Sequence, residues 1–164
     1  MIHLDKTGCF FEVNACREED IPSVLEMYDD FSPKGRFQGM PPWEKQARDV
    51  WVKHLLADGE SFLAWRGGKV IGHVTMLPDF NMSNAEFLIF VHQFDRGKGV
   101  GTALTRTAVR RARERCLKML WLTVHVYNFR ATRLYRKCGF EFCDDCRSGL
   151  ERKMSCCCEL KNDG

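Results

Sequence analysis

The residues with the clearest chemical potential form a glycine-rich turn between an apolar segment and an amphipathic one. The turn runs from Gln93 to Thr102 and reads QFDRGKGVGT. Glycine accepts positive φ angles and has no side chain to keep a ligand away from the backbone. The amides of such a turn, with the positive end of a following helix, can bind an anion. Arg96 and Lys98 add positive charge, so the turn predicts a site for a pyrophosphate.

Three phosphate-binding motifs can be compared with this turn. A Walker P-loop needs Ser or Thr directly after Gly-Lys, whereas Gly99 follows Lys98. The dinucleotide fingerprint GxGxxG/A fails from either starting glycine, because its last position is neither Gly nor Ala. The pattern that fits is R/Q-x-x-G-x-G/A, formed by Arg96, Gly99 and Gly101. For this motif alone, an ordinary glycine-rich connection from strand to helix is the structural alternative.

A second motif lies downstream, where residues 120–140 read LWLTVHVYNFRATRLYRKCGF. Ala131, Leu134, Tyr135 and Cys138 are spaced as one stripe of a helix, and Gly139 is suited to end that helix. A tyrosine in such a stripe can also be a plain core residue.

The two motifs together resemble those of the GNAT superfamily of N-acetyltransferases. In that superfamily the first motif holds the pyrophosphate of coenzyme A, and the second reads L-x-V, then N-x-x-A-x-x-L-Y-x-x-x-G-F. The resemblance covers roughly residues 9–158 and implies one N-acetyltransferase domain spanning residues 1–164. It implies transfer of an acyl group, most simply acetyl from acetyl-CoA, to a primary amine of a small molecule or protein by direct attack. The matching positions are Leu122, Val124, Asn128, Ala131, Leu134, Tyr135, Gly139 and Phe140.

The resemblance also implies the roles of individual residues. Backbone groups at the end of the apolar strand would pair with the pantetheine arm, and the amides of the turn would hold the pyrophosphate. Asn128 would contact the cosubstrate, and Tyr135 would lie near its sulfur as the acid for the leaving thiolate. The implied cofactor-binding residues are Phe90, Val91, His92, Arg96, Gly97, Lys98, Gly99, Val100, Gly101, Thr102 and Asn128.

The general base is predicted to be Glu86, which opens the strand before the glycine turn and resembles the position used by some histone-type members. Other members carry a glutamate between the Leu and Val of the second motif, but Thr123 occupies that position here. The histidines at positions 73, 92 and 125 also fall near the predicted cleft, although a lone histidine is more often structural. Many members use water chains instead of a side-chain base.

The acceptor is expected to meet the segment that joins the first two helices, as in other members. This segment combines Tyr28, Asp29, Asp30 and Phe31 with Phe37, Gln38 and Trp43. Aromatic rings beside carboxylates could receive a cationic amine. Equally, the aspartates could end a solvated helix while the aromatic rings belong to the core.

The elements that must position these residues follow from hydrophobic periodicity and turn signals. We expect a strand at 8–15, a helix from Ile21, a loop at 32–42, and a second helix with Trp43, Ala47, Val50, Trp51, His54 and Leu55 on one face. Strands follow at 61–66, 69–77 and 85–91, then a helix near 100–115, a strand at 119–126 and a helix at 129–138. Two strands near 140–144 and 148–159 close the chain. The predicted fold class is α/β, and the resemblance implies a mostly antiparallel mixed sheet, flanked by helices, with splayed central strands.

Composition limits the other function classes. The 164 residues are 45% hydrophobic and 29% charged, with a net charge of +3. The N-terminus lacks the apolar core of an export signal, and no apolar run has the length of a membrane span, so a cytoplasmic protein without membrane contact is expected. The arginine-rich helix near 106–115 is interpreted as a solvated face, with no nucleic acid as partner. The oligomeric state is left open, a homodimer included.

Nine cysteines require a separate interpretation. Cys143 and Cys146 form one CxxC, and positions 156–158 are three consecutive cysteines. A zinc site normally needs two such pairs facing one point, so no metal is predicted and the cysteines are interpreted as small buried hydrophobes. A metal or redox module therefore ranks behind two other hypotheses, an acetyltransferase and a catalytically silent acyl-CoA sensor.

Overall fold

The computed structural model of the chain describes residues 1–35, 39–79 and 83–158, with the backbone alone at 144–148. Its helices are α1 (Ile21–Asp30), α2 (Lys45–Asp58), α3 (Val100–Glu114) and α4 (Phe129–Lys137), with short 3-10 turns η1 (Glu18–Asp20) and η2 (Gln93–Asp95). Its strands are β1 (Ile2–Leu4), β2 (Phe10–Ala15), β3 (Glu60–Arg66), β4 (Lys69–Asp79), β5 (Asn84–Val91), β6 (Met119–His125), β7 (Glu141–Ser148) and β8 (Glu151–Cys157). Among the described residues, no helix is both long and apolar enough to span a membrane.

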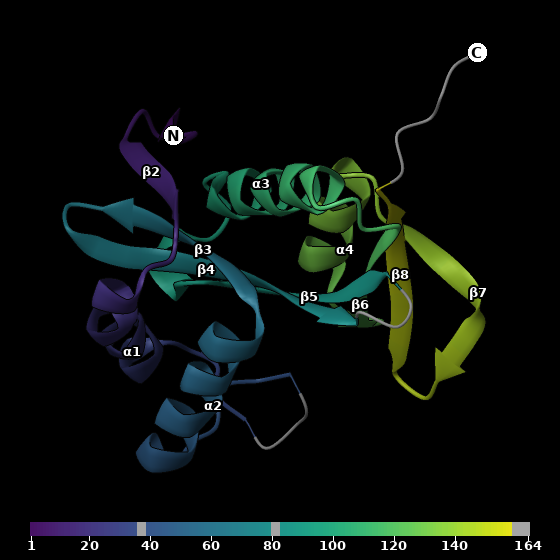
Figure 1. Cartoon of the computed structure of the whole chain (residues 1–164), viewed down its shortest axis with the longest axis horizontal. Helices are drawn as coiled ribbons and strands as arrows, with labels where there is room; N and C mark the ends of the chain where they lie inside the picture. The colour runs from purple at the N-terminus through teal and green to yellow at the C-terminus, as the bar shows by residue number, and fades with distance from the viewer. Residues whose placement is uncertain (36–38, 80–82, 159–164) are drawn as a thin grey trace.

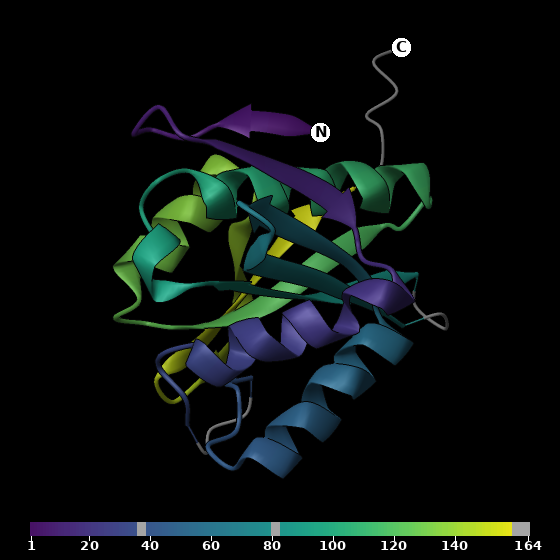
Figure 2. The same ribbon diagram turned by 90° about the vertical axis from the view of Figure 1, so that its left-hand side faces the viewer.

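The eight strands form one sheet in the order β1-β2-β3-β4-β5-β6-β8-β7 (Figure 1). Every neighbouring pair is antiparallel except β5 and β6, which run parallel. Helices α3 and α4 cover one face, and α1 and α2 cover the other (Figure 2). This arrangement confirms the predicted mixed, mostly antiparallel α/β fold.

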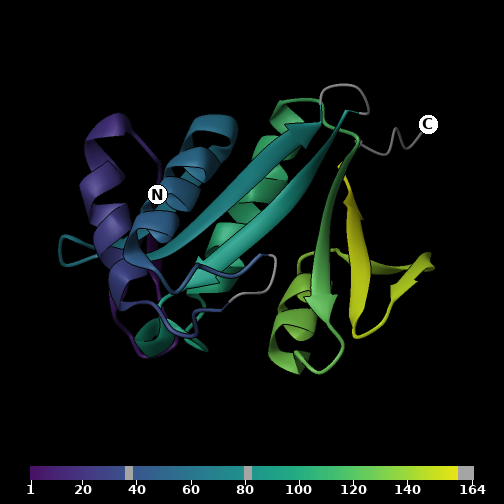
Figure 3. The same cartoon turned by 90° about the horizontal axis from the view of Figure 1, so that it is seen from below.

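The parallel pair at the centre of the sheet separates soon after it forms. Pairing between β5 and β6 extends only from Asn84–Met119 to Glu86–Trp121. Beyond that point β5 stays paired with β4, and β6 stays paired with β8. The two strands therefore diverge and leave a V-shaped opening in the sheet, as Figure 3 shows. The splayed central strands expected from the resemblance are thus present.

Side chains alternate along β5 and divide the core into two parts. Phe87 points to the α3 side, where it packs with Leu104, Leu122 and Phe140. Phe90 points to the opposite side and packs against α1 and α2. This alternation follows from the two-residue period of a strand. Neighbouring residues of β5 therefore face opposite sides of the sheet at the opening.

Two sequence expectations need correction. Strand β1 was not predicted, because three residues are too few to show a periodic pattern. The predicted apolar face of α2 is mostly wrong, since Trp43 precedes the helix and is 67% exposed, and Ala47, Val50 and His54 also face solvent. Of the predicted residues only Leu55 is buried, and Trp51 is half-buried. The buried residues of α2 are Arg48, Val52 and Leu55. The two terminal nitrogens of the buried Arg48 guanidinium donate to the Pro42 and Trp43 carbonyls and to the Asp29 carboxylate, whereas its Nε has no partner among the described residues.

Candidate active site

Glu86 lies at the point where β5 and β6 separate. It is the last residue of β5 in the parallel pairing, opposite Trp121. Its side chain is half-buried on the α1–α2 side, and burial raises the pKa of the carboxyl above its usual range. Among the described residues this carboxylate has no hydrogen bond or ion pair. A carboxyl group with a raised pKa and no partner, beside an opening in the sheet, has the properties of a general base.

Only every second residue of β5 directs its backbone N–H and carbonyl toward the opening. Val91 is such a residue, because its carbonyl accepts a hydrogen bond from Arg96 Nε at 2.8 Å across the edge that faces the opening. His92 is not, because its N–H donates to the Ile71 carbonyl at 2.9 Å and its carbonyl accepts from Asp95 N–H. By the same alternation, the backbone of Phe90 faces β4, where Phe90 pairs with His73. The prediction that all three residues can pair with a cosubstrate is therefore corrected to Val91 alone.

The glycine turn leads directly into α3. Gly97 and Gly99 have φ angles of 78° and 106°, which other residues adopt only with strain. Gly99 is the N-cap of α3, with no side-chain cap, and the first turn of the helix carries no acidic residue. The N–H groups at this end, up to Thr102, have no partner within the helix. The turn therefore presents backbone donors that are unpaired in the described part of the chain, together with the positive end of a 15-residue helix.

The charged side chains of the turn are less available than the sequence indicates. The Arg96 guanidinium lies over the Phe31 ring, 5.1 Å from its centroid, and also donates to the Ser32 carbonyl. Burial and the nearby Arg130 lower the pKa of Arg96. Lys98 Nζ lies 3.5 Å from Asp95 Oδ1. Arg96 thus holds the end of α1 against the turn, and the backbone donors provide the main feature for an anion.

Helix α4 supplies the two remaining predicted residues. Asn128 is its N-cap, and its side-chain oxygen accepts from Ala131 N–H at 3.2 Å. Within the described residues its amide nitrogen has no acceptor and so remains available as a donor. Tyr135 lies on the α3 side of the sheet, with its ring edge-on to Phe87 at 6.0 Å and tilted against Phe140 at 5.9 Å. Burial raises the pKa of Tyr135 to about 12. Its hydroxyl has no hydrogen-bond partner among the described residues.

The three histidines considered as bases occupy different environments. His73 is fully buried between Tyr28 (Nδ1 to hydroxyl, 2.8 Å) and Ser61 (Nε2 to hydroxyl, 3.0 Å), and burial lowers its pKa to about 3. It is a neutral core residue. His92 Nε2 lies 2.9 Å from an Asp30 carboxylate oxygen. His125 is exposed and contacts the Tyr127 ring.

The residues considered for acceptor recognition are mostly structural. Tyr28 and Phe31 are buried in the aromatic cluster around Phe90. Asp29 binds Arg48 at 2.6 Å and Lys45 at 2.8 Å, so its charge is already paired. The two aromatic rings thus belong to the core, as the alternative expected, whereas Asp29 is ion-paired and not part of a solvated helix end. Phe37 and Gln38 lie outside the described residues.

The cysteines of the C-terminal strands do not gather around a common centre in the described part of the chain. No group of three His, Cys, Asp or Glu side chains there could hold a metal ion. Cys156 and Cys158 are buried in the core on the α3 side. Cys143 donates to the Ser155 hydroxyl at 3.3 Å, and the side chain of Cys146 lies outside the described residues.

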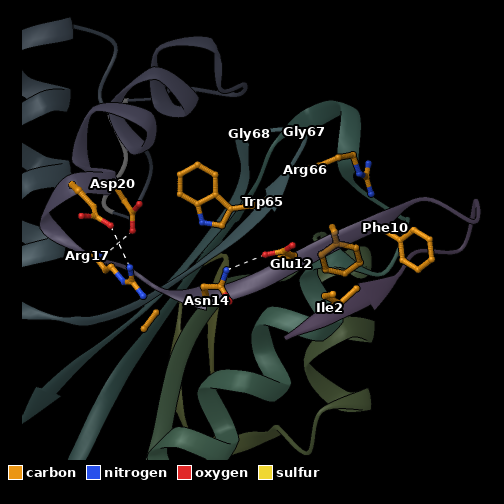
Figure 4. A pocket seen from close by; sticks show the side chains of 13 residues that line it. Ile2, Phe10, Glu12, Asn14, Arg17, Asp20, Trp65, Arg66, Gly67 and Gly68 are labelled. Carbon is orange, nitrogen blue, oxygen red and sulfur yellow. Dashed lines mark hydrogen bonds and ion pairs between the residues drawn. The ribbon is translucent and has the colours of Figure 1, made fainter.

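A hollow of about 930 Å³ lies at the N-terminal end of the sheet, away from the opening between β5 and β6 (Figure 4). It is lined by β1, β2, the end of β3 with the turn that follows it, and η1. Exposed Ile2 and Phe10 form its apolar part, and Arg17 is already bound to Glu19 and Asp20. None of the predicted site residues lines this hollow.

Comparison with known proteins identifies the family. Residues 21–140 match the acetyltransferase (GNAT) family. The chain is 30% identical over 141 residues to an uncharacterized N-acetyltransferase of Methanocaldococcus jannaschii, covering 80% of this chain and 61% of that protein. It is 50% identical over 48 residues to streptothricin acetyltransferase of Streptomyces lavendulae, covering 29% of this chain and 25% of that enzyme. The chain thus spans less than two thirds of the length of both relatives.

Solved structures share the fold at low sequence identity. The GNAT domain of PAT from S. lividans superimposes with a TM-score of 0.78 at 17% identity, over 94% of each chain. The protein yncA of Salmonella typhimurium, solved with its cofactor acetyl-CoA, gives 0.69 at 16% identity, over 91% of this chain and 94% of that one. The family match and the fold agree, and the chain belongs to the GNAT acetyltransferase family.

Proposed function

We propose that this chain is an acetyl-CoA-dependent N-acetyltransferase that acts on a primary amine of a small molecule or protein. The observation that carries the proposal is the pair of unpartnered groups at the central opening. The Glu86 carboxylate lies on one face of the sheet and the Tyr135 hydroxyl belongs to the other. Acetyl transfer to an amine is assisted by an acceptor for the amine proton and by a hydrogen-bond donor for the leaving thiolate. Membership of the family and the acetyl-CoA complex of yncA support the same reaction.

The residues present fit acetyl-CoA. The turn from Arg96 to Thr102 combines unpaired amides with a helix N-terminus, which suits a pyrophosphate. The open edge of β5, which the backbone of Ile89 faces by the same alternation as Val91, can pair with the amides of a pantetheine arm, as an added strand would. The amide nitrogen of Asn128, at the start of α4, has no hydrogen-bond partner among the described residues. When bound there, acetyl-CoA supplies the activated acetyl group.

The proposed reaction is direct attack. Glu86 accepts a proton from the incoming amine, whose nitrogen forms a bond to the thioester carbon. The N–H of Val91, on the open edge of β5, donates to the oxygen that becomes negative. The Tyr135 hydroxyl donates to the sulfur as the carbon–sulfur bond breaks, so that the thiolate leaves with a hydrogen bond in place. This assigns Glu86 and Tyr135 as catalytic residues of the proposed enzyme.

Release of free thiol tests the proposal. The purified protein is incubated with acetyl-CoA and a panel of polyamines, amino acids, aminoglycosides and peptides. We expect thiol release that depends on one amine class, with the acetylated amine detected by mass spectrometry. Tight binding of acetyl-CoA without turnover on any amine would instead favour the silent sensor.

The raised pKa of Glu86 predicts a specific pH dependence. A carboxyl base works only when ionised, so kcat/KM is expected to fall as pH drops through a pKa that lies above the ordinary range of glutamate. The acceptor amine attacks only when unprotonated, so the profile of kcat/KM against pH has a second inflection at the pKa of the amine, near 10. Glu86→Gln should lower kcat/KM by about 10²-fold and remove the acidic limb, leaving the amine limb in place. An unchanged acidic limb in this variant would assign it to another group.

A further inference from the structure

The Phe142 ring of β7 contacts two arginine side chains that come from different elements. The guanidinium carbon of Arg136, in the last turn of α4, lies 5.2 Å from the ring centroid, and that of Arg152, in β8, lies 3.8 Å from it. Because both distances are measured to one ring, the two charges lie within one Debye length of each other, about 10 Å at moderate ionic strength. We call Arg136, Phe142 and Arg152 the β7 cluster.

The two positive charges of the β7 cluster have no counter-ion from the protein. Within the described part of the chain, Arg136 and Arg152 make no ion pair and no side-chain hydrogen bond, and the Nε of Arg152 is buried. Arg48 and Arg66 also have a buried Nε without a partner, but their terminal nitrogens bind carboxylates. A buried polar atom without a partner requires an explanation. Arg152 therefore has donors that no described residue accepts.

The carboxylates nearest in sequence lie on the other face of the sheet. Phe142 packs against the core on the α3 side, and Arg152 lies over its ring. Side chains alternate between the two faces along a strand, so the preceding residues, Glu141 and Glu151, point to the opposite face. The pairing of Glu141 with Ser155 agrees with this placement. The sheet itself thus separates these carboxylates from the β7 cluster.

The β7 cluster is separate from the candidate active site. β7 is the last strand in the sheet order, and β8 lies between it and β6 (Figure 1). Arg136 follows Tyr135 in the sequence, but its guanidinium contacts β7, whereas the Tyr135 ring contacts Phe87 of β5. None of the three cluster residues belongs to the glycine turn.

Contacts within the protein explain only part of this arrangement. A cation in the last turn of a helix is stabilised by the helix dipole, which explains the charge of Arg136. An aromatic ring also attracts a cation, which explains the contact of Arg152 with Phe142. Neither effect provides acceptors for the guanidinium N–H groups, and two like charges close together repel each other. An anion bound by both arginines would supply the acceptors and offset the repulsion.

We propose that the β7 cluster is a binding site for the terminal phosphate group of a small molecule. A phosphate group carries about −1.5 to −2 charges at neutral pH, which matches two guanidinium groups. Guanidinium N–H groups form paired hydrogen bonds with phosphate oxygens, and a guanidinium that lies over a ring keeps its N–H edge for a ligand. A phosphomonoester and free orthophosphate share this chemistry. The site does not depend on the proposed acetyl transfer.

A titration followed by NMR tests the site directly. Glycerol phosphate or orthophosphate is added to the isotope-labelled full chain at constant ionic strength, and the Nε–H resonance of Arg152 is followed. We expect a saturable shift of this resonance. Tighter binding of glycerol phosphate than of orthophosphate assigns the site to a phosphomonoester, and the reverse order assigns it to the free ion. Succinate is the carboxylate probe and should bind more weakly than both.

Arg136→Gln is expected to weaken phosphate binding about tenfold, since it removes a charged hydrogen bond. Arg136 is exposed, so this variant should keep the fold, which a thermal melt checks. Arg113→Gln is the matched control, because Arg113 is an exposed arginine in the last turn of α3. It removes the same charge from the same place in a helix, and the affinity for phosphate should stay at the wild-type value.

Coenzyme A provides a second control, because it carries phosphate groups of its own. If the proposed function holds, coenzyme A should move the Gly99 amide resonance and leave Arg152 in place. No response to coenzyme A would count against the proposed function and leave the β7 cluster intact. The proposal is overturned if the phosphate probes move Gly99 and not Arg152, or if succinate or sodium chloride shifts Arg152 equally. Equal affinity of Arg136→Gln and the wild type would overturn it as well.

Discussion

Tyr135→Phe is expected to lower kcat about 10²- to 10³-fold while leaving the affinity for acetyl-CoA and the melting temperature nearly unchanged. The ring contacts with Phe87 and Phe140 survive this substitution, and the hydroxyl has no partner among the described residues whose hydrogen bond would be lost. A role confined to packing would leave kcat at the wild-type value. Steady-state kinetics on an identified amine, with a thermal melt beside it, measures both quantities.

The expected size follows from the acidity of the two groups. A tyrosine with a pKa of about 12 would lose about 5 kcal/mol on full proton transfer to a thiolate of pKa about 8.5. Tyr135 therefore acts by donating a hydrogen bond to the developing thiolate more than by giving up its proton. Hydrogen-bond donors to a developing negative charge in a water-excluded site raise the rate by about 10²–10³-fold. We therefore expect the loss of kcat to lie in the lower part of the range known for general acids.

Tyr28→Phe is the matched control for this experiment. The Tyr28 hydroxyl is buried and contacts His73 Nδ1 at 2.8 Å, so its removal leaves a buried imidazole nitrogen without a partner. The expected cost is about 1–3 kcal/mol of stability, with kcat unchanged. The two variants should therefore show opposite effects, one on turnover and the other on the melting temperature. If both variants lowered kcat equally, the assignment of Tyr135 as the donor to the leaving thiolate would be wrong.

Gly99→Ala is expected to weaken acetyl-CoA binding about ten- to hundredfold. Its Cβ would meet no atom within 4 Å, so the substitution acts through the φ angle of 106° and not through a clash. An alanine would shift the turn toward allowed angles and move the amides that start α3. Losing one charged hydrogen bond to a phosphate accounts for the expected change. Gly101 is a poorer choice, because a Cβ there would lie 3.1 Å from Leu134 and disturb the packing of α3 against α4.

Gly68→Ala provides the comparison for Gly99→Ala. Gly68 also has a positive φ, 74°, and open space around its Cβ, but it lies in the β3–β4 turn. Both variants should lose about 1–2 kcal/mol of stability, and only Gly99→Ala should lose affinity for acetyl-CoA by calorimetry. Unchanged affinity in Gly99→Ala would show that the pyrophosphate does not bind at this turn.

The features that were predicted correctly from the sequence are those that depend on the local pattern of residues. The positive φ angles of Gly97 and Gly99, the start of α3 and the end of α4 all follow from residue types and spacing. The mostly apolar strand β5 and the order of the later elements were also predicted correctly. These features are determined by residues close together in the sequence, so the sequence alone is sufficient to predict them.

What the sequence could not predict depends on distant partners. The Arg96 side chain turns toward Ser32, 64 residues away, and so leaves the anion to the backbone. The backbone groups of His92 are used by Ile71 and Asp95, which no motif indicates. The Asp5–Arg66 pair joins positions 61 residues apart. Such contacts need the sheet register, and the register follows from the whole core.

The opening between β5 and β6 has a consequence for how the protein behaves in solution. Past Glu86 and Trp121 the facing edges of the two strands are unpaired in the described structure, like the outer edge of any sheet. Unpaired edges are templates for strand pairing between molecules, and proteins usually shorten or charge them. Here the edge cannot be closed without removing the proposed place for the pantetheine arm. The form without cosubstrate should therefore aggregate sooner at high concentration, and acetyl-CoA should delay that aggregation by occupying the edge.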